Sequence, residues 1–90
     1  MYKILFSLSA KKQLQKLDKN IQKHIFKVLE RIRIRPEKHV RKLIGDPGYR
    51  LRVGDYRVIM DIDNDRLLIL VIKIGHRKKI YKQFKGSSGT

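Results

Sequence analysis

Cysteine is absent from this chain of 90 residues, and so is any long hydrophobic run. The lack of cysteine excludes a disulfide framework and a thiolate nucleophile, and it fits a reducing cytoplasm. The longest apolar run, Leu67 to Ile72, is far shorter than the roughly 20 residues that a membrane helix needs. The N-terminus lacks the cationic and apolar segments of a signal peptide. We therefore expect a soluble, cytoplasmic protein.

Acidic residues are also scarce. The chain has 8 Asp and Glu against 23 Lys and Arg, which gives a formal net charge of +15. Such an excess weakens the compact state by self-repulsion and attracts polyanions. The charge therefore favours nucleic acid, an anionic membrane or an acidic protein as a partner. The alternative is a basic surface that only keeps the protein in solution.

Hydrophobic periodicity predicts a strand and then a helix at the start of the chain. The residues "YKILFS", Tyr2 to Ser7, have the composition of a short strand. Ser9 is a suitable N-cap for a helix that should end near Lys19. One face of this helix carries the apolar residues Ala10, Leu14 and Leu17.

A second helix is predicted to begin at the cap Asn20 and to stop before Pro36, because the residue before a proline disfavours helix. Its apolar residues recur at the helical period at Ile21, Ile25, Val28, Leu29 and Ile32. We expect the two helices to form a hairpin with solvated, lysine-rich outer faces. A basic loop should follow, from Pro36 to Gly48.

Beyond Gly48 the pattern changes to the period of strands. Tyr49 to Val53 alternates, Gly54-Asp55 is a two-residue turn, and Tyr56 to Ile62 alternates again, which predicts a β-hairpin. The run from Leu67 to Ile74 is almost continuously apolar, as in a central strand covered on both faces.

These elements indicate one α+β domain over residues 1–85, in the order β-α-α-β-β-β. We expect an antiparallel sheet with the N-terminal helical hairpin packed on one face. The segment that follows the last strand, "RKKIYKQFK", fits a short strand or a helical turn. The final residues, 86–90, should be a disordered tail.

The hairpin turn fixes which side chains share a face. It places Arg52 opposite Arg57, and it puts both on one face with Arg50. The other hairpin face is apolar and should meet the helices. Like charges directly opposite in an antiparallel pair destabilise by about 0.2 to 1 kcal/mol each. The arrangement therefore suggests an anionic ligand, and phosphate suits the planar fork of arginine. The alternative is a hairpin whose arginines extend separately into water.

The position of Lys73 depends on the loop before the third run. A three-residue loop at Asn64 to Arg66 sets Lys73 opposite Arg57 on the cationic face, whereas a two-residue loop would bury an unpaired lysine. With the three-residue loop, Gly75 and Arg77 share the cationic face. The residues expected to face the core are then Leu68, Leu70, Ile72 and Ile74.

Two phrases, "YRLRVGDYRVIMDID" and "LLILVIKIGHRKKIY", give the chain a family resemblance. In this order and spacing the sequence resembles the RelE/ParE superfamily of toxins, and the RelE branch in particular, over Tyr2 to Tyr81. The resemblance implies a ribosome-dependent ribonuclease that cuts mRNA in the decoding site and is held inactive by an antitoxin. The implied partners are a cognate antitoxin, the ribosome and mRNA, and no cofactor is expected.

The resemblance also implies site residues. Arg50 and Arg52 match the basic pair of the first hairpin strand, Arg57 matches the arginine of the second, and Arg77 and Tyr81 match the arginine and tyrosine near the end. The implied reaction is attack of the RNA 2′-hydroxyl on the adjacent phosphate without a metal ion. Catalytic roles then fall to Arg52, Arg57, Arg77 and Tyr81.

RNA-binding roles are assigned to Arg50, Lys73 and His76. The general base is left open, because arginine cannot accept a proton in proteins. Tyr81 and His76 are the candidates, although strand parity turns His76 toward the core.

Two other functions fit the same residues. One is a gyrase-targeting toxin of the ParE branch, which shares the fold without the ribonuclease. The other is a basic RNA-binding module without chemistry. The residues "DIDND" start like a calcium loop, but Arg66 and Ile72 occupy the positions where that loop needs glycine and glutamate. A polar turn accounts for them, and no metal is expected.

Overall fold

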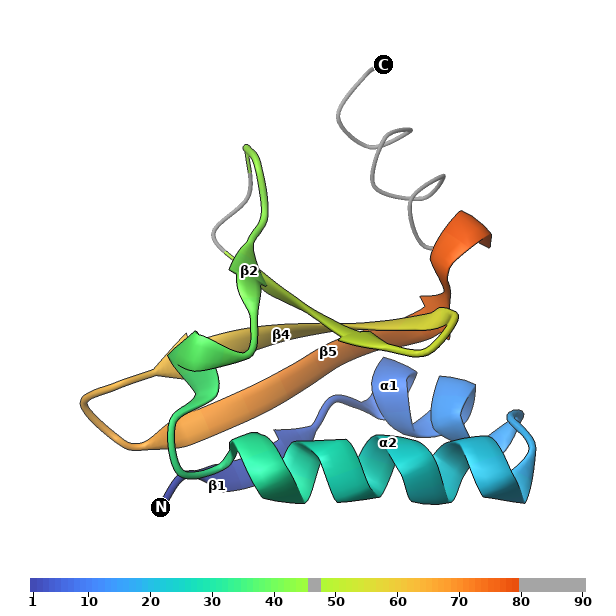
Figure 1. The fold of residues 1–90 in the computed structure, drawn as a ribbon, viewed down its shortest axis with the longest axis horizontal. Helices are drawn as coiled ribbons and strands as arrows, with labels where there is room; N and C mark the ends of the chain where they lie inside the picture. Colours follow the sequence, from blue (N-terminus) through green and yellow to red (C-terminus); the bar gives the residue numbers. More distant parts are fainter. Residues whose placement is uncertain (46–47, 80–90) are drawn as a thin grey trace.

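A five-stranded sheet carries two α-helices on one of its faces (Figure 1). The computed structural model describes residues 1–45 and 48–79. The predicted tail at residues 86–90 lies outside this range. The elements are β1 (Lys3–Phe6), α1 (Leu8–Gln15), α2 (Lys19–Ile32), the 3-10 helix η1 (Pro36–Lys38), β2 (Arg41–Lys42), β3 (Tyr49–Val53), β4 (Tyr56–Asp63) and β5 (Leu68–His76).

The strand order is β1-β5-β4-β3-β2. β1 runs parallel to β5, and the other three pairs are antiparallel. The predicted α+β fold with a helical hairpin on one face is confirmed. The sheet was predicted to be antiparallel, but it is mixed, because β1 runs parallel to β5. None of the helices in the described ranges is both long and apolar enough to cross a membrane.

The first helix begins earlier than the sequence suggested. Its N-cap is Ser7, whose Oγ accepts a hydrogen bond from the Ala10 N–H at 3.0 Å. The prediction of Ser9 as the cap was wrong, because Ser9 already lies within the first turn. Ser7 is the residue that leaves β1, and its hydroxyl stands three positions before the N–H that it accepts, as a cap requires.

The boundaries between the helices also differ from the prediction. α1 ends at Gln15 rather than near Lys19, and α2 begins after Asp18 rather than at Asn20. The connection is tight because the Leu17 N–H donates to the Leu14 carbonyl at 3.0 Å. The helical hairpin is confirmed, with a shorter first arm.

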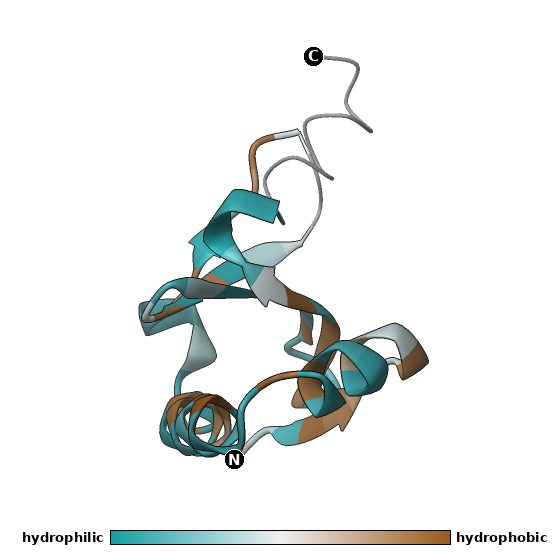
Figure 2. Cartoon of the chain, turned by 90° about the vertical axis from the view of Figure 1, so that its right-hand side faces the viewer, coloured by the Kyte–Doolittle hydropathy of each residue, from teal (hydrophilic) through white to brown (hydrophobic). Residues whose placement is uncertain are grey.

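The core lies between the helices and the sheet. α2 buries Ile25, Leu29 and Ile32 and leaves its lysines exposed. Its ribbon accordingly carries both hydrophobic and hydrophilic colours (Figure 2). The two helices and the three long strands supply the buried side chains of this cluster: Ala10, Leu14, Ile25, Leu29, Ile32, Leu51, Val53, Val58, Met60, Ile69, Val71 and Ile74. The opposite face of the hairpin, which includes Arg50, Arg52, Arg57 and Ile59, does not belong to this core cluster.

The segment predicted as a basic loop contains two elements. η1 starts at Pro36, which is fully buried, and β2 pairs with β3 so that Arg41 lies opposite Arg50. A strand of two residues has no alternation that a sequence pattern can reveal. It nevertheless extends the sheet beyond the hairpin (Figure 1).

The β3–β4 hairpin has the predicted register. Arg52 lies opposite Arg57, Val53 opposite Tyr56, and Gly54 opens the turn with φ at +59°. This conformation is easily reached only by glycine, and the turn sets the whole arginine face.

The β4–β5 register was predicted wrongly. The loop spans four residues, 64–67, because Asp63 pairs with Leu68. Farther along, Ile59 pairs with Lys73 and Met60 with Val71, so that β5 carries one extra residue in a β-bulge. Lys73 therefore lies opposite Ile59, and Gly75 takes the place opposite Arg57.

The first helix holds the bulge in place. The Ser7 hydroxyl donates to the Ile72 carbonyl at 2.8 Å, and Oε1 of Gln13 accepts from the Ile74 N–H at 2.8 Å. Because the extra residue reverses the side-chain alternation, Ile69 and Val71 enter the core together with Ile74. The prediction that Leu68, Leu70 and Ile72 would do so was wrong; all three are only half-buried.

Candidate nucleic-acid interface

Cationic side chains form two rows across the face of the sheet that is turned away from the helices. In the first row Arg41, Arg50, Ile59 and Lys73 are successive cross-strand partners. In the second row Arg52, Arg57 and Gly75 are partners. Side chains of directly paired residues point to the same face. The sheet therefore gathers cations from four different strands.

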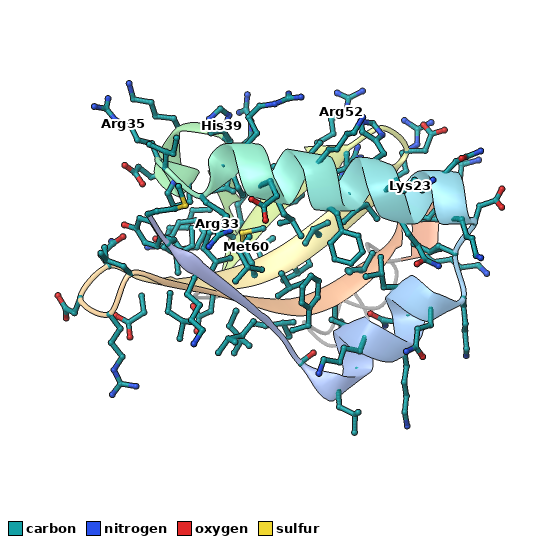
Figure 3. The ribbon with its side chains drawn as sticks, turned by 90° about the horizontal axis from the view of Figure 1, so that it is seen from below. Lys23, Arg33, Arg35, His39, Arg52 and Met60 are labelled. Atoms are coloured by element: carbon teal, nitrogen blue, oxygen red, sulfur yellow. The ribbon has the colours of Figure 1, made fainter. Side chains whose placement is uncertain are left out.

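The rows enclose an open pocket of about 290 Å³, which we call the arginine pocket. Its described lining residues are His39, Arg41, Arg50, Arg52 and Arg57. This lining holds four guanidinium groups and one imidazole, and no carboxylate from the described residues. The labelled side chains of His39 and Arg52 extend along the same edge of the molecule, beyond α2 (Figure 3). A pocket of this charge is suited to a phosphate-bearing ligand.

Arg57 is the most deeply placed of these cations, with 7% of its surface exposed. Its Nη1 donates to the carbonyl oxygens of Gly54 at 3.1 Å and of Tyr56 at 3.0 Å. These bonds offset part of the cost of burying the charge and orient the guanidinium. Arg50 is half-buried, whereas Arg41 and Arg52 are exposed. The pocket thus combines one buried cation with one half-buried and two exposed ones.

The structure brings together some of the predicted site residues and separates others. Arg50, Arg52 and Arg57 line the arginine pocket, and Lys73 lies in the same row as Arg50. The exposed Arg77 begins a helical stretch over residues 77–79, and its N–H donates to the Asp55 carbonyl at 2.8 Å near the hairpin tip. Arg77 is not among the residues that line the pocket. Tyr81 lies outside the described residues.

His76 stands apart from the arginine pocket. It is paired with Tyr56, and the two rings meet edge to face with centroids 5.5 Å apart. Its Nδ1 accepts a hydrogen bond from the Lys78 N–H at 3.3 Å. Parity along its own strand predicts that His76 turns toward the core. Its pairing with Tyr56, which belongs to the apolar alternation of the hairpin, agrees with that prediction.

Two residues of the pocket were missed by sequence reasoning. His39 follows η1 and Arg41 opens β2, in the segment that read as a basic loop. The only available signal was the basic composition of this loop, which does not show that the loop folds back beside the hairpin. The loop lies beside the hairpin because Arg41 pairs with Arg50, a contact between residues distant in the sequence.

In the acidic turn after β4, the carboxylate of Asp63 accepts hydrogen bonds from backbone N–H groups of the same turn. Oδ1 of Asp63 accepts from the N–H groups of Asp65 at 3.0 Å and Arg66 at 3.1 Å. These bonds are those of a polar turn, as predicted. Within the described ranges, no three histidine or carboxylate side chains gather to hold a metal ion.

Comparison with known proteins identifies the family. The family model described as "ParE toxin of type II toxin-antitoxin system, parDE" matches residues 4–81. An Escherichia coli protein described as a "RelE-like toxin protein" is 31% identical over 81 residues, which cover 87% of this chain and 85% of that protein.

Solved toxin–antitoxin complexes contain the same fold. A chain of the RelBE2 complex from Mycobacterium tuberculosis has a TM-score of 0.78 at 22% identity, covering 84% of this chain and 98% of that one. A chain of the intact RelBE complex from Escherichia coli has a TM-score of 0.72 at 27% identity, covering 84% of this chain and 96% of that one. Sequence and fold agree that this chain belongs to the ParE toxin family of type II toxin–antitoxin systems, within the RelE/ParE superfamily.

Proposed function

We propose that this toxin is a ribosome-dependent endoribonuclease that cuts mRNA in the decoding site by attack of the RNA 2′-hydroxyl on the adjacent phosphate. The arginine pocket carries the proposal, because four guanidinium groups converge on one cavity of about 290 Å³. Cleavage of this kind passes through a phosphorane-like state with extra negative charge, and preorganised cations stabilise such a state. The nucleophile belongs to the RNA itself, so the reaction needs no metal or other cofactor.

Each cation has a role that follows from its position. Arg57, oriented by two carbonyl groups, faces the developing charge on the phosphate together with Arg52. Arg50, with Arg41 beside it, holds the RNA backbone. Lys73, in the same row as Arg50, adds a further contact to the RNA. The roles proposed for Arg77, in stabilising the charge on the phosphate, and for Tyr81, in stacking on a base, come from the family resemblance. The ribosome supplies the alignment that an open pocket cannot provide alone.

Regulation is proposed to follow the family pattern. RelE-like toxins have been solved as complexes with their antitoxins. With a net charge of +15, this toxin fits a cognate antitoxin whose acidic segment covers the cationic face. The complex should weaken as salt concentration rises. Action on ribosomes would place the toxin in the cytoplasm.

The decisive experiment uses purified toxin and ribosomes translating a defined mRNA, with the RNA 5′ ends mapped after incubation. We expect cuts at the decoding site, products ending in a 2′,3′-cyclic phosphate, and no cut at a position carrying 2′-deoxyribose. Arg52→Ala should reduce the cleavage rate about 100-fold or more, as loss of one transition-state donor does. Arg66→Ala, at an exposed loop arginine, is the matched control and should cleave normally.

The family name supports a second candidate, a gyrase-targeting toxin. Intact mRNA together with toxin-dependent trapping of gyrase on DNA would favour this candidate. Tight binding of mRNA without cleavage and without trapped gyrase would instead indicate an RNA-binding module. Either result would overturn the ribonuclease proposal.

A further inference from the structure

The reaction in the arginine pocket needs a group that accepts a proton. As the 2′ oxygen forms its bond to phosphorus, the 2′-hydroxyl loses its proton, and the bond from phosphorus to the 5′ oxygen breaks. Arginine cannot accept that proton. The described residues that line the pocket are four arginines and His39, and the imidazole is the one side chain among them with a ring nitrogen that can accept a proton.

We propose that His39 is a catalytic residue and acts as the general base that takes the proton from the 2′-hydroxyl. This assignment rests on the proposed ribonuclease function. In the balanced step, a ring nitrogen of His39 receives the 2′ proton, the phosphate becomes a 2′,3′-cyclic diester, and the departing 5′ oxygen takes a proton from water. The imidazolium then returns its proton to solvent.

The backbone holds His39 at the pocket from both sides. On its N-terminal side the His39 N–H donates to the Pro36 carbonyl at 3.0 Å, and Pro36 is fully buried. On its C-terminal side Val40 packs against the core, and Arg41 is paired with Arg50. The exposed imidazole therefore projects from a fixed support, as a general base requires.

The other histidines are engaged elsewhere. His76 packs edge to face on Tyr56, and its Nδ1 accepts from the Lys78 N–H. His24 is exposed on α2, and the helices cover the opposite face of the sheet. Of the three histidines in the chain, only His39 lines the arginine pocket.

The neighbours of His39 suit a base that must work beside a phosphate. Arg41 of β2, Arg50 and Arg52 of β3 and Arg57 of β4 share the pocket with it, while Glu37 and Lys38 belong to its own 3-10 turn. A phosphate held by the guanidinium groups would lie in the same pocket that His39 lines. The strands thus supply the anion-binding groups, and the η1–β2 segment supplies the proton acceptor.

The test measures single-turnover cleavage of mRNA on translating ribosomes by wild-type toxin, His39→Ala and the matched control His24→Ala. General-base catalysis contributes about 10²- to 10⁴-fold. We therefore expect His39→Ala to cleave at least 100-fold more slowly, with ribosome affinity unchanged, and added imidazole to restore part of the rate. His24→Ala should cleave like the wild type. His39→Gln, which keeps a polar side chain of similar size, should be as slow as His39→Ala.

The possible outcomes separate this assignment from the ribonuclease proposal. Wild-type cleavage with an equally fast His39→Ala variant would overturn the role of His39 alone. A slow, folded variant that imidazole does not restore, and whose ribosome affinity has fallen, would show that His39 binds RNA and is not the base. Absence of wild-type cleavage would overturn both proposals.

Discussion

Arg52 on β3 lies directly opposite Arg57 on β4, one residue from the turn that joins the strands. In such a pair the Cβ atoms are only about 5 Å apart. The two side chains then diverge in exposure, because Arg57 is buried against backbone carbonyls while Arg52 is exposed. A fold selected only for stability would not pair two cations here. We therefore expect this pair to lower the stability of the fold while serving its function.

Replacing Arg52 should separate these two properties. We expect Arg52→Gln to raise the free energy of unfolding by about 0.2 to 1 kcal/mol, because it removes a like-charge pair. The gain should shrink at high salt, since screening weakens the repulsion. Urea denaturation at low and high salt measures both effects. Arg66→Gln, in the exposed loop after β4, is the control and should change stability by less than about 0.5 kcal/mol. A loss of stability in Arg52→Gln would contradict the repulsion argument.

The hairpin was predictable because its determinants are local. Alternating residues on either side of the Gly54-Asp55 turn fix the register, and the structure has that register. The placement of Lys73 on the cationic face also held, although for a different reason. The loop has one residue more than expected and the bulge adds another, so the two differences restore the alternation. Before the bulge only the longer loop acts, so side chains there, such as Leu70, were predicted on the wrong face of the sheet.

The features that the sequence could not predict depend on contacts between residues far apart in the chain. The bulge depends on Ser7 and Gln13, which lie far from β5 in the chain and bond its backbone. The placement of His39 depends on β2, which is too short for a pattern and exists because it pairs with β3. Both features come from tertiary contacts. The arginine face was therefore visible in the sequence, whereas the completed pocket was not.

Ser7 should matter far more for stability than Ser9. Its hydroxyl both caps α1 through Ala10 and donates to the Ile72 carbonyl at the bulge. Loss of a cap costs about 1 kcal/mol, and the second hydrogen bond adds about as much. Ser7→Ala should therefore lower the free energy of unfolding by about 1 to 2 kcal/mol in urea denaturation, and Ser7→Thr should keep most of it. The control Ser9→Ala should stay within about 0.5 kcal/mol of wild type. Equal effects at the two serines would refute this account of the cap.

The hairpin turn should be sensitive to any side chain at Gly54. A Cβ there would meet no atom within 4 Å, so the cost comes from the backbone, whose φ is +59°. For residues other than glycine, the left-handed region costs about 1 to 2 kcal/mol of conformational free energy. Gly54→Ala should lower the unfolding free energy by that amount. Asp55→Ala, at the neighbouring exposed position, should have a much smaller effect. If both variants unfold alike, the strain at Gly54 is not what controls the turn.

Salt dependence of RNA binding tests whether the arginine pocket contacts phosphates. For single-stranded RNA the logarithm of the binding constant falls with the logarithm of salt concentration, with a slope of about −0.7 per phosphate neutralised. If Arg50 and Arg52 each contact one phosphate, the double variant Arg50→Ala/Arg52→Ala should bind with a slope shallower by about 1.4. The measurement is a salt titration of affinity for a short unstructured RNA.

The matched double variant Arg31→Ala/Arg66→Ala removes the same charge from exposed positions on α2 and on the loop after β4. Because counterion release depends on the phosphates that are contacted, its slope should stay close to that of the wild type, although long-range attraction falls equally in both variants. A slope that changes equally in the two double variants would mean that RNA binding depends on net charge and not on specific contacts in the arginine pocket. A selective change would locate the RNA backbone on the rows of cations that the sheet pairing creates.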